Sequence, residues 1–243
     1  LANFFNSFKS VGGSSESYFW LNNTGSLLNQ TICGLFTGIP NYIMVPIAAK
    51  MVKKWGARAT SIIAGLFGFF AYMTLFFVGF HPFGQTFKDH YIFNLIWVIF
   101  GLTICGLPNK ILNVSGQIVT AEALDYMEWK HGLRNEALVT TVQGYFGKLA
   151  TSVTGWLSGM VLTWINYVPL TDSLGNAVPQ TDPTMLNGIW AVFCILPALA
   201  RGLYGVSFII YPIHGDLQQQ MIVELAEKRA QRLAEQEAKD HQA

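Results

Sequence analysis

Formal charge is scarce in this sequence. Of its 243 residues, 12% are Asp, Glu, Lys or Arg and 51% are hydrophobic. A soluble domain usually carries about 25% charged residues, so this composition indicates a membrane protein rather than a large soluble core. The formal net charge is only +1. Any basic patch is therefore local, and the composition gives no reason to expect a nucleic-acid partner.

Cysteine is also scarce, and catalytic motifs are missing from the sequence. Cys33, Cys105 and Cys194 lie in apolar runs without the spacing of metal ligands. Three thiols cannot all pair within one chain, so buried free thiols are expected. The sequence contains no HExxH, GxSxG, Walker or EF-hand pattern. It therefore predicts neither an enzyme, nor a metal site, nor a cofactor.

A secretory signal is missing as well, because no basic–apolar–small series opens the chain. The chain begins at Leu1 in semi-apolar sequence, and we interpret it as one part of a longer protein. Residues 1–20 are expected to be the end of another helix. Small residues of the kind that break or end a helix follow in this segment, at Gly12, Gly13, Ser14 and Ser15.

Long apolar windows are what the sequence has in abundance. A bilayer core is about 30 Å thick, so a spanning helix needs about 20 apolar residues. Five windows are long enough, and three of them each contain one basic residue, at Lys110, Lys148 or Arg201. The windows are 17–49, with its helix starting near Ser26, then 59–80, 91–121, 137–166 and 186–212. Five membrane spans are therefore expected.

The connections between these windows alternate in charge. Residues 50–58 and 122–136 are rich in Lys and Arg, and the tail at 213–243 is charged as well. The connection at 81–90 has one lysine, and the connection at 167–185 has no Lys or Arg. Because Lys and Arg mark the cytoplasmic side of a membrane, we predict a multi-pass protein of the cell membrane. Its C-terminus is predicted to be cytoplasmic.

The sequence divides into a helix bundle, residues 1–212, and a tail, residues 213–243. Apolar side chains recur near helical spacing in the tail, at Leu217, Met221, Leu225 and Leu233. Oppositely charged i,i+4 pairs add to this pattern, Glu224 with Lys228 and Glu235 with Lys239. We interpret the tail as a cytoplasmic helix that is solvated or lies along the membrane, rather than one that binds a partner.

Lys148 is the most informative residue inside a window. It lies twelve residues beyond Glu136, which is about 18 Å along a helix. An ionisable side chain inside a span costs roughly 3 kcal/mol or more, so it indicates a function. The residues that share its helical face are small or polar: Thr141, Gly144, Tyr145, Thr151, Ser152 and Gly155.

Two further windows carry polar stripes. Lys110 shares a helical face with Asn113 and Gln117, and Pro108 is expected to kink that helix. The first window carries a stripe of Gln30, Cys33, Thr37 and Asn41. Three stripes on three helices suggest a shared aqueous cavity, and the alternative is polar contact between neighbouring helices. For Arg201 we expect snorkelling or an interhelical hydrogen bond rather than ligand binding.

The charged stretch after the third window resembles a segment of a known transporter family. Its pattern is Asp-Tyr-x-Glu-x-Lys, then Arg-x-Glu, then Val-Gln, then a lysine five residues after the glutamine. The matching residues are Asp125, Tyr126, Glu128, Lys130, Arg134, Glu136, Gln143 and Lys148, over 24 residues. This pattern is similar to the junction of helices X and XI in the glycoside–pentoside–hexuronide:cation symporters. These are the melibiose-permease-like branch of the major facilitator superfamily.

The resemblance extends over essentially the whole chain. Residues 50–58 look like the family's basic loop between helices VIII and IX, and residues 211–229 look like its exit from helix XII. The resemblance implies an all-α, polytopic membrane bundle that is the C-terminal six-helix half of a major facilitator fold. Residues 1–20 would be the end of helix VII, and the five windows would be helices VIII to XII. The N-terminal half of the same transporter is the implied partner.

The resemblance also implies roles for individual residues. Lys148 would take the place of the lysine at the family's sugar and cation pocket. Asn113 stands where an aromatic residue is expected, and Gly144 where a hydroxyl-bearing residue is expected, so simple melibiose transport is disfavoured. The predicted substrate-binding residues are Lys148, Lys110, Asn113, Gln143, Thr141 and Gln117. The predicted cytoplasmic gate comprises Asp125, Glu128 and Arg134, with residues 50–58 as a further source of basic partners.

The function that follows is cation-coupled symport of a sugar, glycoside or hexuronide. Na⁺ or H⁺ would be the coupling ion, and the family's cation-binding carboxylates lie mainly in the half that this chain lacks. Two alternatives remain, a lysolipid-type symporter of the same superfamily and a membrane receptor or scaffold that does not transport. A membrane enzyme is disfavoured, because the sequence holds no nucleophile–base or metal pattern.

Overall fold

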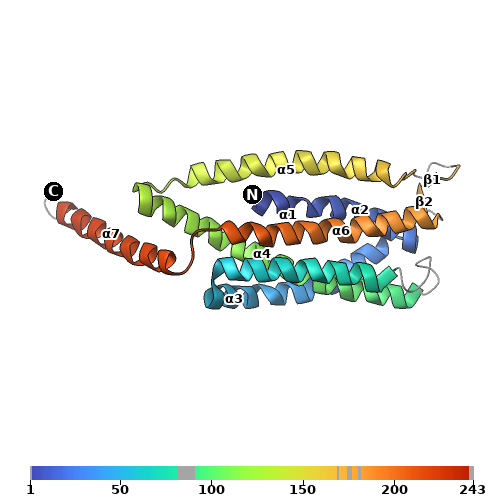
Figure 1. Cartoon of the computed structure of the whole chain (residues 1–243), viewed down its shortest axis with the longest axis horizontal. Coiled ribbons are helices and arrows are strands. Elements are labelled where there is room, and N and C mark those ends of the chain that lie inside the picture. Colours follow the sequence, from blue (N-terminus) through green and yellow to red (C-terminus); the bar gives the residue numbers. More distant parts are fainter. Residues whose placement is uncertain (1, 81–90, 169, 174–176, 180–181, 241–243) are drawn as a thin grey trace.

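The structure is a computed structural model that describes residues 2–80, 91–168, 170–173, 177–179 and 182–240 (Figure 1). Helices make up nearly all of it, which confirms the predicted all-α fold. They are α1 (Ala2–Ser7), α2 (Lys9–Thr24), α3 (Leu28–Leu75), α4 (Tyr91–His131), α5 (Glu136–Trp164), α6 (Pro183–Ser207) and α7 (Asp216–Asp240). Short helical turns, η1 (Phe76–Phe80) and η3 (Phe208–Ile210), extend α3 and α6. The two-residue strands β1 (Leu170–Thr171) and β2 (Ala177–Val178) pair antiparallel.

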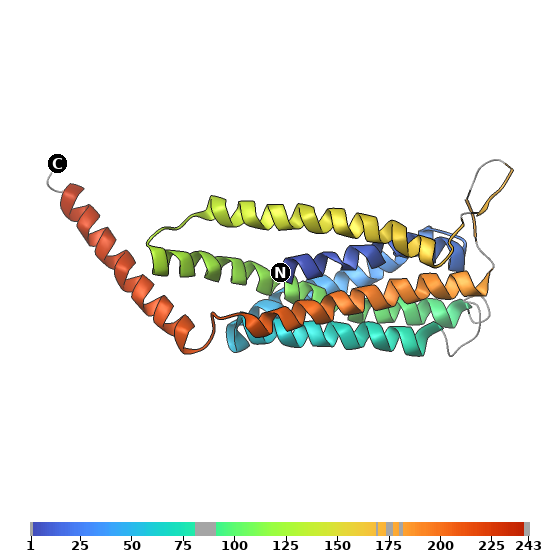
Figure 2. The same cartoon turned by 45° about the horizontal axis from the view of Figure 1, so that its top comes forward.

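Helix α3 consists of two arms that are joined at Gly56. This residue has φ 79° and ψ 161°, which are not helical, and a glycine adopts a positive φ without steric cost. Figures 1 and 2 show that the chain reverses its direction there, so the arms 28–55 and 57–75 lie side by side. The reversal falls inside the basic connection 50–58, where a boundary between two spans was predicted.

The N-terminal segment contradicts one prediction. Helix α2 runs unbroken through Gly12–Ser15, where the sequence was expected to break or end a helix. Gly12 packs on the ring of Pro197 in α6 with no space for a Cβ atom, so its side-chain hydrogen is required for close helix contact. Ser15 Oγ donates to the carbonyl of Val11 at 3.2 Å, which satisfies the hydroxyl within the helix. The helix ends only at Gly25, in the left-handed conformation.

The connections separate into two groups at opposite ends of the bundle. The turn at Gly56 and the connections 132–135 and 211–215 lie at one end, and the turn at Gly25 and the strand segment lie at the other (Figure 2). This agrees with the alternation that the loop charges predict. The predicted external connection 81–90 lies outside the described residues. Which end is cytoplasmic stays a prediction.

Two residues of the connection 132–135 set the boundary between α4 and α5. Gly132 has φ 70°, and its N–H donates to the Glu128 carbonyl at 2.9 Å, which ends α4. Asn135 caps α5, because its side-chain oxygen accepts from the Leu138 N–H at 2.9 Å. Helix α4 continues across Pro108, which is buried.

Three helices in the described part of the chain are long and apolar enough to cross a membrane: 28–78, 91–131 and 183–210. The first spans 51 residues, about 76 Å if it were straight, so its two arms account for two of the predicted spans. Together these helices overlap four of the five predicted windows. The remaining window forms α5, which has 29 residues, and its span stays a prediction.

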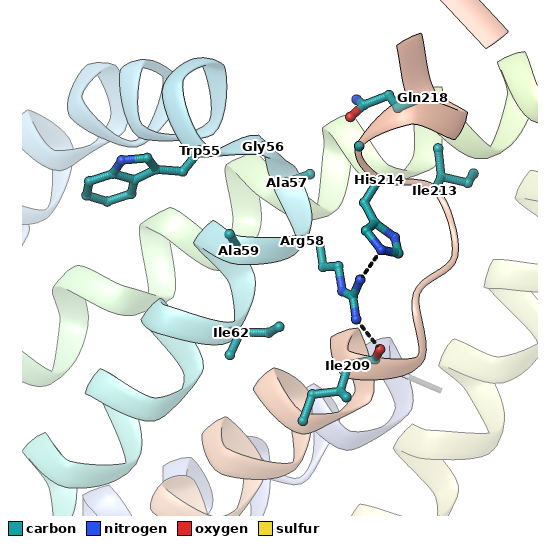
Figure 3. A pocket seen from close by; sticks show the side chains of 11 residues that line it. Trp55, Gly56, Ala57, Arg58, Ala59, Ile62, Ile209, Ile213, His214 and Gln218 are labelled. Atoms are coloured by element: carbon teal, nitrogen blue, oxygen red, sulfur yellow. Dashed lines mark hydrogen bonds between the residues drawn. The ribbon is translucent and has the colours of Figure 1, made fainter. Parts of the chain in front are cut away.

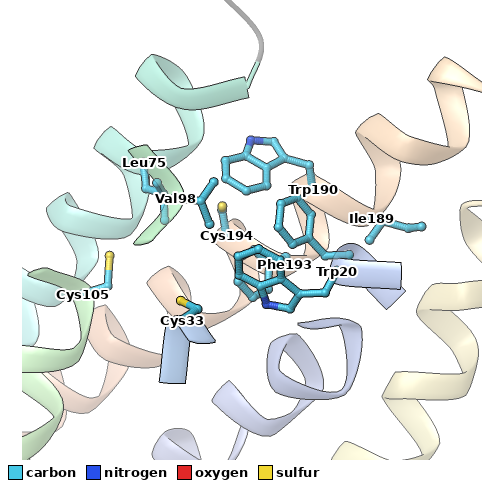
Figure 4. Packing of buried hydrophobic residues seen from close by; sticks show 10 residues of the cluster. Trp20, Cys33, Leu75, Val98, Cys105, Ile189, Trp190, Phe193 and Cys194 are labelled. Atoms are coloured by element: carbon cyan, nitrogen blue, oxygen red, sulfur yellow. The ribbon is translucent and has the colours of Figure 1, made fainter. Parts of the chain in front are cut away.

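Aromatic rings and the three cysteines form the largest core cluster. Trp20 from α2 packs with Trp190 and Phe193 from α6, and Leu75 and Val98 close the cluster from α3 and α4 (Figure 4). The thiols of Cys33, Cys105 and Cys194 are buried and free, as predicted. This cluster joins α2, α3, α4 and α6, whereas α5 contributes none of its buried residues.

The second arm of α3 crosses α6 with backbone in contact with backbone. A Cβ atom built on Gly65 would lie 2.6 Å from the Cα of Gly205. Small residues at such crossings allow helices in a membrane to approach closely. Gly205 faces the same constraint, because a Cβ atom there would lie 3.1 Å from the Cα of Gly65.

We therefore predict that Gly65→Ala lowers the stability of the intact protein by about 1–3 kcal/mol, because the methyl group pushes α3 away from α6. Thermal unfolding in detergent measures the effect. Gly34→Ala on the same helix is the matched control, because a Cβ atom there meets nothing within 4 Å. Equal unfolding temperatures for the two variants would contradict the packing argument.

Candidate functional site

The polar face of α4 contacts the first arm of α3 and helix α2. The Lys110 ammonium lies 4.9 Å from the centroid of the Tyr42 ring, a cation–π contact. One residue earlier, the Asn109 side chain accepts a hydrogen bond from Lys9 Nζ at 3.3 Å. The predicted partners of Lys110 on its face, Asn113 and Gln117, are both exposed.

Lys9 and Glu16 are charged residues of the bundle that the sequence reasoning missed. They lie seven residues apart on α2, so they share one side of the helix, and both are half-buried. The five windows hold no acidic residue, but α2 adds one. The sequence signal for these two residues was their seven-residue spacing in an otherwise uncharged segment. It was missed because residues 1–20 were interpreted as the end of an interrupted helix.

The face of α5 that carries Lys148 is open. Lys148 is exposed, and so are the six residues predicted to share its face, Thr141, Gly144, Tyr145, Thr151, Ser152 and Gly155. The buried residues of α5 lie elsewhere, at Ala150, Thr154 and Val161. Within the described residues, the structure does not bring the Lys148 ammonium into a hydrogen bond or ion pair with the other predicted site residues.

Gln143 is the predicted α5 residue that does contact α4. Its side-chain amide donates to Thr120 Oγ1 at 3.0 Å. The two side chains line a half-open cavity of about 260 Å³ together with Gly116 of α4 and Tyr204 of α6. Most of the other side chains that line this cavity are apolar, so Gln143 and Thr120 are a polar pair in a mainly apolar surrounding.

The polar stripe on the first arm of α3 serves helix packing. Cys33 is 2% exposed and belongs to the core cluster. Asn41 donates to the Thr37 carbonyl at 2.7 Å, and its amide packs on Gly106 of α4. Cys33 and Asn41 therefore face neighbouring helices, and the hydrogen bond of Asn41 stays within α3. Arg201 behaves as expected, because its side chain is buried and donates to Asn6 Oδ1 at 2.8 Å.

The predicted gate residues meet at the end of α4. Arg134 lies 3.3 Å from Asp125, 3.9 Å from Glu128 and 3.0 Å from Glu136. The side chain of Glu128 is only 8% exposed. Because desolvated charges are weakly screened, this carboxylate is the centre of the cluster. The structure thus brings Asp125, Glu128 and Arg134 together.

Helix α7 supplies two further arginines that the sequence reasoning missed. Arg229 lies 2.8 Å from Asp125 and 2.5 Å from Glu128, and Arg232 lies 3.4 Å from Glu128. Hydrogen bonds to Glu128 and then to Asp125 raise the pKa of the Arg229 guanidinium above its ordinary value. These pairs join residues about a hundred positions apart in the chain, so no local pattern could indicate them.

Apolar contacts add to these ion pairs. Met221 and Leu225 of α7 are buried with Ile213 against the rings of Tyr126 and Trp129. The Trp129 indole N–H also donates to Glu224 at 2.6 Å. The first half of the tail helix, which was predicted to be solvated or to lie along the membrane, is mostly exposed but packs its apolar side against α4. Its later residues, such as Leu233, are exposed.

The basic connection 50–58 does not join this cluster within the described residues. Arg58 donates instead to the carbonyl oxygens of Phe208 at 3.2 Å and Ile209 at 2.6 Å, and it contacts the ring of His214. The gate cluster therefore draws its basic groups from Arg134 and α7.

Comparison with known proteins assigns the chain to a family. The family described as MFS/sugar transport protein, of the major facilitator superfamily, matches residues 10–215, which is most of the chain. The chain belongs to this family. No solved structure matches it.

Named relatives of this MFS chain are symporters and sugar transporters. "Uncharacterized symporter YjmB" of Bacillus subtilis is 30% identical over 191 residues, 77% of this chain and 37% of that protein. "Isoprimeverose transporter" of Lactiplantibacillus pentosus is 28% identical over 120 residues, 49% and 23% of the two chains. "Putative sulfoquinovose importer" of Escherichia coli is 35% identical over 89 residues, 34% and 18% of the two.

The matched region covers only part of each relative. The chain spans less than two fifths of the length of these curated relatives. The family is one of transporters, so the prediction that the chain is not an enzyme is confirmed.

The ion-pair cluster predicts a measurable effect on α7. Glu128→Gln removes the carboxylate that three arginines share, and hydrogen bonds to charged groups contribute about 1.5–3 kcal/mol each. We expect local opening of α7 to become about tenfold more frequent or more, as measured by hydrogen exchange of residues 217–232 in the intact protein.

Glu136→Gln is the matched control. Of the three arginines in the cluster, Glu136 contacts only Arg134, and its side chain is 67% exposed. The rate of hydrogen exchange in α7 should therefore be the same in Glu136→Gln as in wild type. Equal protection of α7 in wild type and Glu128→Gln would show that the ion pairs do not hold the tail helix.

Proposed function

We propose that the protein containing this chain is a secondary transporter of a sugar, glycoside or hexuronide, coupled to Na⁺ or H⁺. The observation that carries the proposal is the open face of α5, where Lys148 lies among small and polar residues that are all exposed. A charged group is costly at that depth unless it borders water or a ligand. Membership of the sugar-transport family and relatives named as symporter and transporter support the same function.

The open face of α5 needs a partner. We infer that the partner is the N-terminal half of the same transporter, and that substrate binds between the halves, near the bilayer midplane. The predicted site residues on α4, Lys110, Asn113 and Gln117, would form the facing wall, with Gln143 and Thr141 on α5. A polar cavity of this kind disfavours the lysolipid alternative, which needs a wide apolar opening.

The substrate is inferred to be an anionic sugar derivative. Lys148 and Lys110 would border the site. Lys9 adds a third cation, because its ammonium donates to the side chain of Asn109 on α4. Glu16 of α2 is an acidic residue that could offset part of this charge. Positive charge in a low dielectric favours a carboxylate or sulfonate. The relative named for sulfoquinovose, a sugar sulfonate, supports this inference. The coupling ion would bind mainly in the N-terminal half.

The ion-pair cluster at the end of α4 is proposed as a cytoplasmic gate. Asp125 and Glu128 already pair with Arg134 and α7, and basic groups of the N-terminal half would compete for the same carboxylates. Exchange of these partners would then accompany alternating access.

For this gate we predict that Glu128→Gln changes the balance between inward and outward conformations. An unchanged balance contradicts the gate without affecting the assignment as a transporter.

We predict that the gate end of the bundle faces the cytoplasm of the cell membrane, because basic residues gather there. Lys130→Cys should react with a membrane-impermeant maleimide only after the cells are opened. The native thiols are buried, so their background is expected to be low. Thr171→Cys at the other end of the bundle is the matched control and should react in intact cells. The opposite labelling pattern would reverse the orientation.

The charge of the substrate is predicted from Lys110. In the intact protein, Lys110→Gln should raise the apparent KM for a hexuronide about tenfold or more, because a charge-assisted hydrogen bond is lost. Uptake of the neutral glycoside should remain.

Lys148→Gln should impair uptake of both the hexuronide and the glycoside, since Lys148 is expected to serve the sugar and cation sites together. Lys130→Gln, which removes a lysine outside the site, is the control. Equal affinity of wild type for the uronide and the glycoside would refute the charge argument.

A further inference from the structure

A second cavity lies at the gate end of the bundle, at the chain reversal of α3. Its volume is about 450 Å³. One wall is the turn of α3 from Trp55 to Ala59, and the other is the segment that leaves η3 and enters α7, from Ile209 to Gln218 (Figure 3). The cavity therefore sits where the two arms of α3 meet and where α6 gives way to α7.

The charge of this cavity is positive. Arg58 and His214 line it, and no Asp or Glu belongs to the described residues of its lining. Figure 3 shows the Arg58 guanidinium between the His214 ring and the Ile209 carbonyl. Arginine carries five N–H donors. In Arg58, Nε donates to the Phe208 carbonyl, Nη1 contacts the His214 ring, and Nη2 donates to the Ile209 carbonyl. Donor capacity is left for an anion.

His214 faces Arg58 through one of its ring nitrogens. A guanidinium has no acceptor, so His214 Nε2 accepts the hydrogen bond from Arg58. The second ring nitrogen, Nδ1, is then the one that can donate to a ligand oxygen. Arg58 and His214 thus present two kinds of donor to the same cavity.

Two basic residues come directly before the turn that lines the cavity. Lys53 and Lys54 are exposed on the last turn before Gly56, and Lys54 Nζ lies 5.9 Å from the centroid of the Trp55 ring. Tryptophan is enriched at membrane–water interfaces. Exposed apolar side chains also occur on the helices that lead to the cavity, α3, α6 and η3: Ile63, Val206, Ile209 and Ile210.

We propose that this cavity binds the phosphate of an anionic glycerophospholipid. Arg58 and His214 would donate to the phosphate oxygens, Lys53 and Lys54 would attract the head group, and the acyl chains would lie along the exposed isoleucines. Basic pockets between membrane helices on the cytoplasmic side favour anionic head groups. The apolar surface beside the cavity favours a lipid over a soluble phosphate, which shares the same charge but has no chains to bury.

Such a lipid would join the two arms of α3 to the beginning of α7. Its phosphate would contact residues on both walls, which are about 150 positions apart in the sequence. The expected consequence of binding is an increase in stability, because a ligand that binds only the folded state stabilises it.

The test is thermal unfolding of the intact transporter in detergent with added lipid. Dioleoyl-phosphatidylglycerol should raise the unfolding temperature saturably, and dioleoyl-phosphatidylcholine, glycerol 3-phosphate and inorganic phosphate should not. His214→Gln and the double variant Lys53→Gln/Lys54→Gln should each weaken the apparent affinity for phosphatidylglycerol, by about tenfold for His214→Gln. Lys130→Gln, a matched loss of one exposed lysine at the same end, should bind as wild type does.

Arg58→Gln should weaken binding most, but Arg58 also holds two carbonyl groups of the α6 end, so this variant can lose stability for that reason alone. His214→Gln therefore decides the matter. Full affinity in His214→Gln and in the double lysine variant overturns the site. Equal stabilisation by phosphatidylcholine overturns the requirement for an anion, and equal stabilisation by inorganic phosphate overturns the lipid as ligand.

Discussion

A charged side chain costs roughly 3 kcal/mol or more in the middle of a bilayer, and the arrangement of this chain follows that cost. Most charges lie at one end of the bundle, where Asp125 and Glu128 of α4 attract arginines from two later segments, Arg134 and Arg229. The same two carboxylates thereby hold both the α4–α5 connection and the tail helix. Lone cations within the bundle contact a ring or an amide oxygen instead. Lys148 is the exception, and its exposed position is what points to a ligand.

Features that depend on local sequence could be predicted. The apolar windows give the helices, because burial of about 20 consecutive apolar residues is required whatever the neighbours are. Gly132 and Asn135 give the α4–α5 boundary, because their backbone and side-chain preferences act within one turn. The contact among Asp125, Glu128 and Arg134 was also within reach, since a short connection separates these residues.

Features that depend on distant partners could not be predicted. Helix α2 continues through Gly12 because Pro197 lies against it, and a propensity argument does not include that neighbour. The docking of α7 depends on Arg229 meeting Glu128 across 101 positions, together with the buried Met221. Lys148 shows the opposite limit. Its place in a spacing pattern was clear, but its side chain is exposed in the structure, so the described contacts do not show what it binds.

The docking of α7 on α4 has a mechanical consequence. Helix α7 has 25 residues, about 37 Å in length, and only its first half is held against Tyr126 and Trp129. A rigid rod held at one end magnifies rotation: a tilt of the α4 end by about 0.1 radian would displace the far end of α7 by about 4 Å. Small rearrangements among the membrane helices are therefore converted into a larger displacement at the outer end of this helix. A spectroscopic label near Glu235 would sense them at a distance from the lipid.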